Sequence, residues 1–229
     1  QAFLAVGDNA TAERLADALI KLQRNGKAWF NAYVIDSKDI ARKLPEQQTS
    51  FVGANMAIGH ALLNVLEVTT NKELAERIVN VSVDLAEWVA GLTLSTEAYS
   101  YVINNKGSKE ASTEYNQRVF AFYYQLFNQS QNAGHRHKEF FTKVSWRIDF
   151  PGLKWKADRI IKWIQEKMFV GDHYLVGYKD ARQEIAVEDL APNQAWAYPQ
   201  YLGPIMAAIA GLNPQDFAGG LDWLFARQS

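Results

Sequence analysis

The sequence of 229 residues contains no cysteine. This absence excludes disulfides, thiolate metal sites and cysteine nucleophiles. The chain also lacks a run of about 18 apolar residues, the length that a membrane-spanning helix requires, so no transmembrane span is expected. A strong charge of either sign is missing as well, because 24 basic and 25 acidic residues leave a formal net charge of −1. Nucleic acid is therefore not expected to be the main partner.

Motifs for common cofactors are also missing. The sequence contains no phosphate-binding loop, dinucleotide fingerprint, zinc-protease motif or nucleophile elbow, so we expect no cofactor and no metal site. The length fits a single domain spanning residues 1–229. The lack of cysteine fits an exported bacterial protein, which predicts an extracellular or periplasmic location. Residues 1–6 resemble the end of a helix already under way, which predicts sequence upstream of them.

Helical patterns of two kinds alternate along the chain. The stretches 53–68 and 112–128 are apolar on every face, as in a helix buried on all sides. The stretches 8–24 and 74–88 are apolar on one face only, as in a helix that covers a core. Buried helices inside and amphipathic helices outside predict an all-α protein, an α/α toroid of αα-hairpins. A linear solenoid is the alternative arrangement.

Three turns occupy equivalent places between a buried and an amphipathic segment. They are Gly7-Asp8-Asn9, Thr69-Thr70-Asn71 and Leu212-Asn213-Pro214. We interpret them as marking an internal repeat of about 50–60 residues. Residues 169–186 alternate glycine, aromatic and β-branched residues, which predicts one small two-stranded β-hairpin.

Several motifs follow one another along most of the chain. They are GANMAIGHALL at 53–63, STEYN at 112–116, GYKD at 177–180 and EDLAPNQAWA at 188–197. In this order they resemble the six-hairpin (α/α) toroid proteins related to glycoside hydrolases. The chain departs from that pattern where Pro199 and Pro204 interrupt the last inner helix, because proline lacks a backbone donor. Only about four hairpins fit, so we expect another chain or a missing N-terminal segment to complete the ring.

The resemblance implies a glycoside hydrolase-like protein that acts on an oligo- or polysaccharide. In such a toroid, the first turns of the inner helices and the loops before them line one end of a central cavity. A carboxylic acid that protonates the leaving oxygen and a carboxylate that activates water would perform the reaction. Glu114 is the predicted acid and Asp189 the predicted base. The predicted substrate-binding residues are Trp29, Tyr33, Asp36, Asn55, Asn116, Asn193 and Trp196.

Other interpretations of these residues remain open. Glu114 and Asp189 could each cap a helix instead of acting on a substrate. The same scaffold could also serve as a non-catalytic saccharide-binding or assembly protein, since one fold hosts many activities. His135 and His137 diverge if they lie on a helix, so we expect surface residues rather than metal ligands. Phe122 is expected to be fully buried between two layers.

Overall fold

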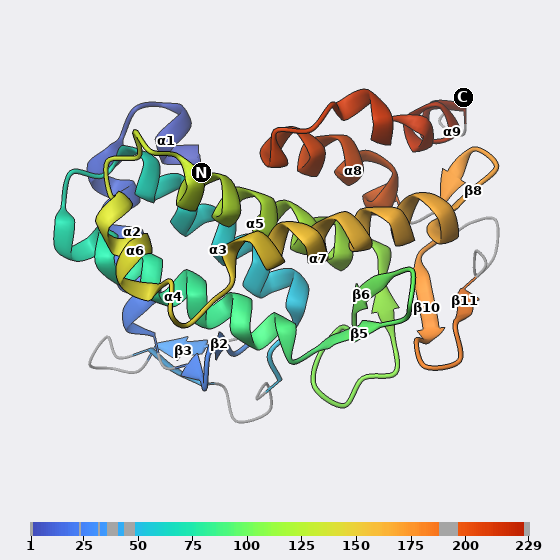
Figure 1. The fold of residues 1–229 in the computed structure, drawn as a ribbon, viewed down its shortest axis with the longest axis horizontal. Coiled ribbons are helices and arrows are strands. Elements are labelled where there is room, and N and C mark those ends of the chain that lie inside the picture. The colour runs from blue at the N-terminus through green and yellow to red at the C-terminus, as the bar shows by residue number, and fades with distance from the viewer. Residues whose placement is uncertain are drawn as a thin grey trace. The chain divides into compact units, whose positions relative to one another are not determined.

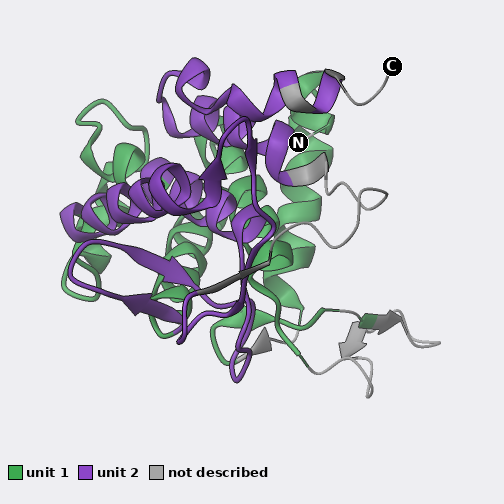
Figure 2. Cartoon of the chain, turned by 90° about the vertical axis from the view of Figure 1, so that its right-hand side faces the viewer, with its two compact units in different colours: residues 1–91, 126–150 green, residues 92–125, 151–229 purple. Residues whose placement is uncertain are grey.

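The computed structural model describes residues 2–22, 24–31, 33–35, 41–43, 49–187 and 197–226. The chain divides into two compact units, shown in separate colours in Figure 2. The first comprises residues 1–91 and 126–150, and the second comprises residues 92–125 and 151–229. Most described residues are helical, so the predicted all-α class holds in the coarser sense of a mainly helical protein, with several short strands besides (Figure 1). Among the described residues, no helix is both long and apolar enough to cross a bilayer.

The first unit is built from helices and two short strand pairs. One helix, α5 (Thr113–Gln131), begins in the second unit and ends in this one. The other helices of the first unit are α1 (Ala2–Ala5), α2 (Asn9–Lys21), α3 (Val52–Val68), α4 (Lys72–Ala90) and α6 (Lys138–Val144). The antiparallel strand pairs are β1 (Arg24–Asn25) with β2 (Ala28–Trp29), and β3 (Tyr33–Ile35) with β4 (Ala41–Lys43).

Helix α3 is the centre of the first unit. Most of its residues are buried, as its apolar character on all faces predicts, and it packs against α2 and α4. The side chains of Asp8 and Asn71 cap α2 and α4, because each accepts a hydrogen bond from a first-turn amide. Asn213 caps the short 3₁₀ helix Pro214–Phe217 in the same way. The three turns predicted to be equivalent therefore share one capping contact.

The second unit contains more strands than the sequence predicts. Its helices after α5 are α7 (Phe150–Trp163), extended by a π-helical turn (Ile164–Met168), then α8 (Ala197–Ala210) and α9 (Gly219–Ala226). Strands β5 (Thr93–Ser95) and β6 (Ser100–Val102) form one hairpin, and β8 (Phe169–Val170) and β9 (His173–Tyr174) form another. Strand β10 (Gly177–Asp180) lies between β7 (Ala111–Ser112) and β11 (Ile185–Val187) in a three-stranded sheet.

Two local predictions for the second unit are corrected by this arrangement. A single hairpin over 169–186 is wrong, because β8 and β9 pair with each other while β10 pairs with β7 and β11. The prolines do not interrupt the last apolar helix, since α8 continues through Pro204. Pro199 lies in its first turn, where the backbone N–H has no partner within the helix.

Aromatic side chains form the core of the second unit. The rings of Phe120 and Phe217 stack with their centroids 5.5 Å apart. The ring of Tyr101 lies 5.3 Å from Trp163 and 5.4 Å from Tyr178. The side chain of Phe122 is 0% exposed, which confirms its predicted burial.

One contact recurs in front of two apolar helices, α3 and α5. The fourth residue of each is an asparagine whose side-chain amide binds the backbone of the last residue of a preceding strand. Asn55 accepts from Trp29 N at 2.7 Å and donates to Trp29 O at 3.1 Å. Asn116 accepts from Val102 N at 2.7 Å and donates to Val102 O at 3.0 Å. We call this contact the amide clamp.

A third amide clamp precedes α8. Gln200 is again the fourth residue of its helix, and it accepts from Tyr174 N at 2.8 Å and donates to Tyr174 O at 2.7 Å. Tyr174 is again the last residue of its strand, β9. Each clamp thus belongs to a set of an amphipathic helix, a β-hairpin and an apolar helix. These sets are α2–β1–β2–α3, α4–β5–β6–α5 and α7–β8–β9–α8. The sequence pattern predicts a hairpin only in the third of these sets, within residues 169–186.

Candidate functional site

A small sheet holds the opening of α5 in place. Strand β10 pairs with β7 just before the helix, and Thr113 N donates to Val176 O at 2.8 Å. Gly177 has a φ of 143°, and a Cβ there would lie 2.0 Å from Ala111 O. Only glycine permits this close approach of the two strands. The segments that precede α5 and α8 in the sequence therefore meet beside the first turn of α5.

Glu114, the predicted acid, lies in that first turn. Its Oε1 is 3.1 Å from Nη2 of Arg118 on the following turn, and both side chains are mostly buried. The ion pair orients the carboxylate at the helix N-terminus, where negative charge is favoured. The hydroxyl of Ser112 accepts from Tyr115 N at 3.5 Å, so Ser112 occupies the capping position.

Tyr115 is a candidate that the sequence reasoning missed. It follows Glu114 directly, and its side chain is partly exposed. Burial, together with the neighbouring Glu114 carboxylate, raises the pKa of the Tyr115 phenol. The phenol is therefore protonated at neutral pH and can donate a hydrogen bond to a ligand oxygen. Its place inside the STEYN motif was the signal that could have singled it out.

Three of the predicted substrate-binding side chains are buried. Asn55 is 1% exposed and Asn116 is 0% exposed, because both amides are engaged in clamps. Each Nδ2 also donates at 2.9 Å to the carbonyl four residues earlier. Trp29 is 0% exposed and its Nε1 donates to Leu19 O at 2.8 Å. These residues support the loops in front of α3 and α5, and none of the three reaches solvent.

The remaining predicted residues have different positions. Tyr33 is partly exposed, its hydroxyl accepts from Phe30 N at 3.1 Å, and its ring packs edge-on against that of Phe30. Tyr33 belongs to the first unit, whereas Glu114 belongs to the second. Asp36, Asp189, Asn193 and Trp196 lie outside the described residues. The pairing of Glu114 with Asp189 therefore stays a prediction.

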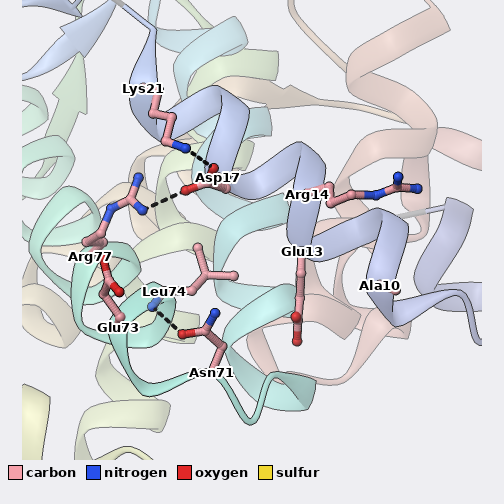
Figure 3. Close-up of a pocket in the computed structure, with 9 residues that line it drawn as sticks. All are labelled: Ala10, Glu13, Arg14, Asp17, Lys21, Asn71, Glu73, Leu74 and Arg77. Carbon is pink, nitrogen blue, oxygen red and sulfur yellow. Dashed lines mark hydrogen bonds and ion pairs between the residues drawn. The ribbon is translucent and has the colours of Figure 1, made fainter.

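A shallow groove of about 530 Å³ lies between α2 and α4, away from the residues predicted from the sequence (Figure 3). Asp17 lies between two cations there, 2.6 Å from Arg77 Nη1 and 2.5 Å from Lys21 Nζ. The hydrogen bond from Lys21 is the main cause that lowers the pKa of Asp17. The contact with Arg77 connects α4 to α2, whereas Lys21 lies on the same helix as Asp17. The groove is lined by Ala10, Glu13, Arg14, Asp17, Lys21, Asn71, Glu73, Leu74 and Arg77.

The histidine pair is buried, which corrects the prediction of a surface position. His135 is 7% exposed and His137 is 1% exposed. Nε2 of His137 lies 2.9 Å from Thr69 O, and Arg136 donates to the carbonyls of Val68 and Thr69. The segment 135–137 therefore covers the C-terminal end of α3, where cations and donors are favoured. Among the described residues, no group of three or more acidic or histidine side chains could hold a metal.

We expect the stability of the protein to fall as the pH drops below about 6.5, the ordinary histidine pKa. Burial lowers the pKa of His135 in the folded state, partly opposed by Glu67 and reinforced by His137, Lys138 and Arg136. The unfolded chain then binds a proton that the folded chain resists, so acid favours unfolding. Urea unfolding of the wild type and of His135→Asn at pH 7.5 and pH 5.5 measures the loss of unfolding free energy on acidification.

Asparagine at position 135 can still accept the hydrogen bond that His135 Nδ1 receives from His137 N. The variant therefore removes the titratable imidazole and keeps an acceptor for His137 N. A smaller loss of unfolding free energy on acidification than in wild type is the expected result. An equal loss in both proteins would contradict the assignment to His135.

A scan against protein-family models finds no match, and a search of curated proteins finds none either. The resemblance to six-hairpin toroid proteins therefore rests on the sequence motifs alone.

Proposed function

We propose that the protein is a carbohydrate-active, glycoside hydrolase-like protein on an α/α toroid scaffold. The observation that carries the proposal is the amide clamp, repeated in front of α3, α5 and α8. A clamp that recurs at the same helix position supports a repeated unit of an amphipathic helix, a hairpin and an apolar helix. Such units, added side by side, are the building blocks of helical rings and solenoids.

Each clamp joins the two ends of a loop. The clamped residue and the amide are 26, 14 and 26 positions apart before α3, α5 and α8 respectively. The two hydrogen bonds close each loop at its base and leave its tip free to vary, as is usual for functional loops on a rigid scaffold. The loops and the first helical turns contain most of the predicted site: Tyr33, Asp36, Glu114, Asp189, Asn193 and Trp196.

In this proposal, the residues that open α5 face the sugar. Glu114 serves as the acid that protonates the departing glycosidic oxygen, and Asp189 serves as the base that activates water. Arg118 orients the Glu114 carboxylate through the 3.1 Å ion pair. The Tyr115 phenol donates a hydrogen bond to a substrate hydroxyl or ring oxygen.

A non-catalytic saccharide-binding protein is the second candidate. The contact between Glu114 and Arg118 favours it, because the guanidinium holds the carboxylate in place as a hydrogen-bond acceptor. In that case the carboxylate accepts hydrogen bonds from sugar hydroxyls and no bond is broken. Completion of the ring by another chain or segment stays a prediction in both cases.

The experiment measures the turnover and the binding of a panel of neutral and acidic polysaccharides by the wild-type chain and its variants. For an enzyme, Glu114→Gln and Asp189→Asn should each reduce the release of reducing ends by about 10²–10⁴-fold. The substitutions keep the size of each side chain and remove its ionisable group. Glu13→Gln on α2 is the matched control and should retain full activity.

The outcomes separate the two candidates. Turnover that both variants abolish supports the enzyme. Saccharide binding without turnover, weakened by Glu114→Gln, supports the binding protein. If no polysaccharide in the panel is bound or cleaved by the wild-type chain, the proposal fails.

A further inference from the structure

A polar cluster of the second unit lies where α7 meets the turn between β5 and β6. Arg159 of α7 donates to Glu97 O at 2.9 Å, to Tyr99 O at 3.1 Å and to Ser100 Oγ at 3.2 Å, and it also bonds Thr96 O. All four acceptors are neutral atoms. The guanidinium is therefore held in one position by the protein, while these contacts leave its positive charge uncompensated.

Trp155 lies one helical turn before Arg159 and is 55% exposed. The guanidinium carbon of Arg159 is 4.6 Å from the centre of the indole ring. A cation over an aromatic face is attractive, so the contact helps to fix the ring. An indole that is held in place and open to solvent is suited to stack on a flat ligand surface.

A second aromatic ring, Tyr99, has two ammonium groups close to it. Nζ of Lys162 and Nζ of Lys167 are each 5.4 Å from its centre, and both lysines are exposed. The Tyr99 hydroxyl donates to Glu166 at 2.8 Å, so one carboxylate is also present. The cluster comprises Tyr99, Trp155, Arg159, Lys162, Glu166 and Lys167, and we call it the α7 patch. It contains three cations and one carboxylate, and Glu184 is a second carboxylate close enough to act on the Tyr99 phenol.

We propose that the α7 patch binds an acidic polysaccharide, one whose sugars carry carboxylates. The choice of a saccharide rests on the proposed function, whereas the preference for acidic sugars rests on the patch itself. The exposed Trp155 ring can stack on the apolar face of a pyranose. Lys162 and Lys167 can pair with carboxylates of neighbouring sugars, and Arg159 adds positive charge beside them, although four of its five N–H groups are bound to the β5–β6 turn. The α7 patch therefore offers both an aromatic surface for a sugar ring and positive charge for its carboxylate.

Nucleic acid would also offer negative charge and flat rings. A single-stranded nucleic acid and a polyuronate both carry about one negative charge per residue, so charge alone does not distinguish them. The choice of a saccharide therefore rests on the proposed function. We therefore assign the patch to acidic saccharide and use single-stranded DNA as the competitor in the test.

The test measures retardation of the full chain in gels containing polygalacturonate, dextran or oligothymidylate. Polygalacturonate should retard the wild-type protein at low salt and dextran should not, and added salt should weaken the effect by screening. Trp155→Ala should reduce the affinity for polygalacturonate by about tenfold, the size expected for loss of a stacking ring. The double variant Lys162→Gln/Lys167→Gln should reduce it to a similar extent.

Matched controls come from the first unit. Trp146 is 83% exposed, so Trp146→Ala removes an indole that is even more accessible than that of Trp155. Lys21 and Lys72 have side chains that are 67% and 79% exposed, so Lys21→Gln/Lys72→Gln removes two surface ammonium groups. Both control proteins should be retarded like the wild type. Unchanged circular dichroism spectra of all variants ensure that the fold is kept.

Glu114→Gln separates this inference from the proposed function. Retardation that survives Glu114→Gln and is lost in the Trp155 and lysine variants supports the α7 patch, whether or not turnover is found. Retardation that is lost equally in the control variants overturns it. Absence of retardation by polygalacturonate, or equally strong retardation by oligothymidylate, overturns it as well.

Discussion

Replacing Asn116 with alanine should destabilise the protein by about 3–5 kcal/mol, because two buried backbone groups lose their partner. The side chain is 0% exposed, and it binds both Val102 N and Val102 O as well as Ser112 O. Alanine leaves all three groups without this amide and also creates a cavity. Urea or thermal unfolding followed by circular dichroism measures the loss.

Two further variants test the mechanism of this clamp. Asn116→Asp keeps the acceptor for Val102 N but removes the donor and buries a charge, so it should be about as destabilising as alanine. Asn105→Ala is the control, because it changes a partly exposed asparagine in the loop between β6 and β7. It should change the unfolding free energy by less than about 0.5 kcal/mol. A stable Asn116→Ala protein would show that the clamp contributes little to folding.

Replacing Phe122 with alanine should also cost about 3–5 kcal/mol, because it removes a whole buried ring. Phe122 is 0% exposed and lies in the middle of α5, with its ring centre 6.2 Å from that of Tyr123. The surrounding residues belong to a close-packed core, so they cannot fully collapse into the space. The unfolding midpoint in urea provides the measurement.

Phe225→Ala is the control for the loss of an aromatic ring. Phe225 lies in α9 and is 62% exposed, so its removal leaves no buried cavity. We expect a much smaller change in unfolding free energy than for Phe122→Ala. Equal effects of the two substitutions would mean that α5 is not part of the core in solution.

The sequence pattern alone determined the helices and the turns between them. A helix that is apolar on all faces needs burial, and a one-faced helix needs one partner surface, so 53–68 and 74–88 could be assigned from periodicity. Asp8, Asn71 and Asn213 could be recognised as caps, because a cap binds an amide two or three residues away. Burial of Phe122 followed from its position in the apolar run.

Contacts between distant parts of the chain were decided by the tertiary structure. The amide clamps join residues 14 or 26 positions apart, so nothing in the local sequence distinguishes Asn55 or Asn116 from a ligand-binding asparagine. The pairing of β7 with β10 depends on Gly177, whose close approach to Ala111 is visible only when both strands are present. The histidine pair was misplaced for the same reason, since it is buried by the end of α3. Periodicity reports how each segment faces a core, and only folding determines which segments supply that core.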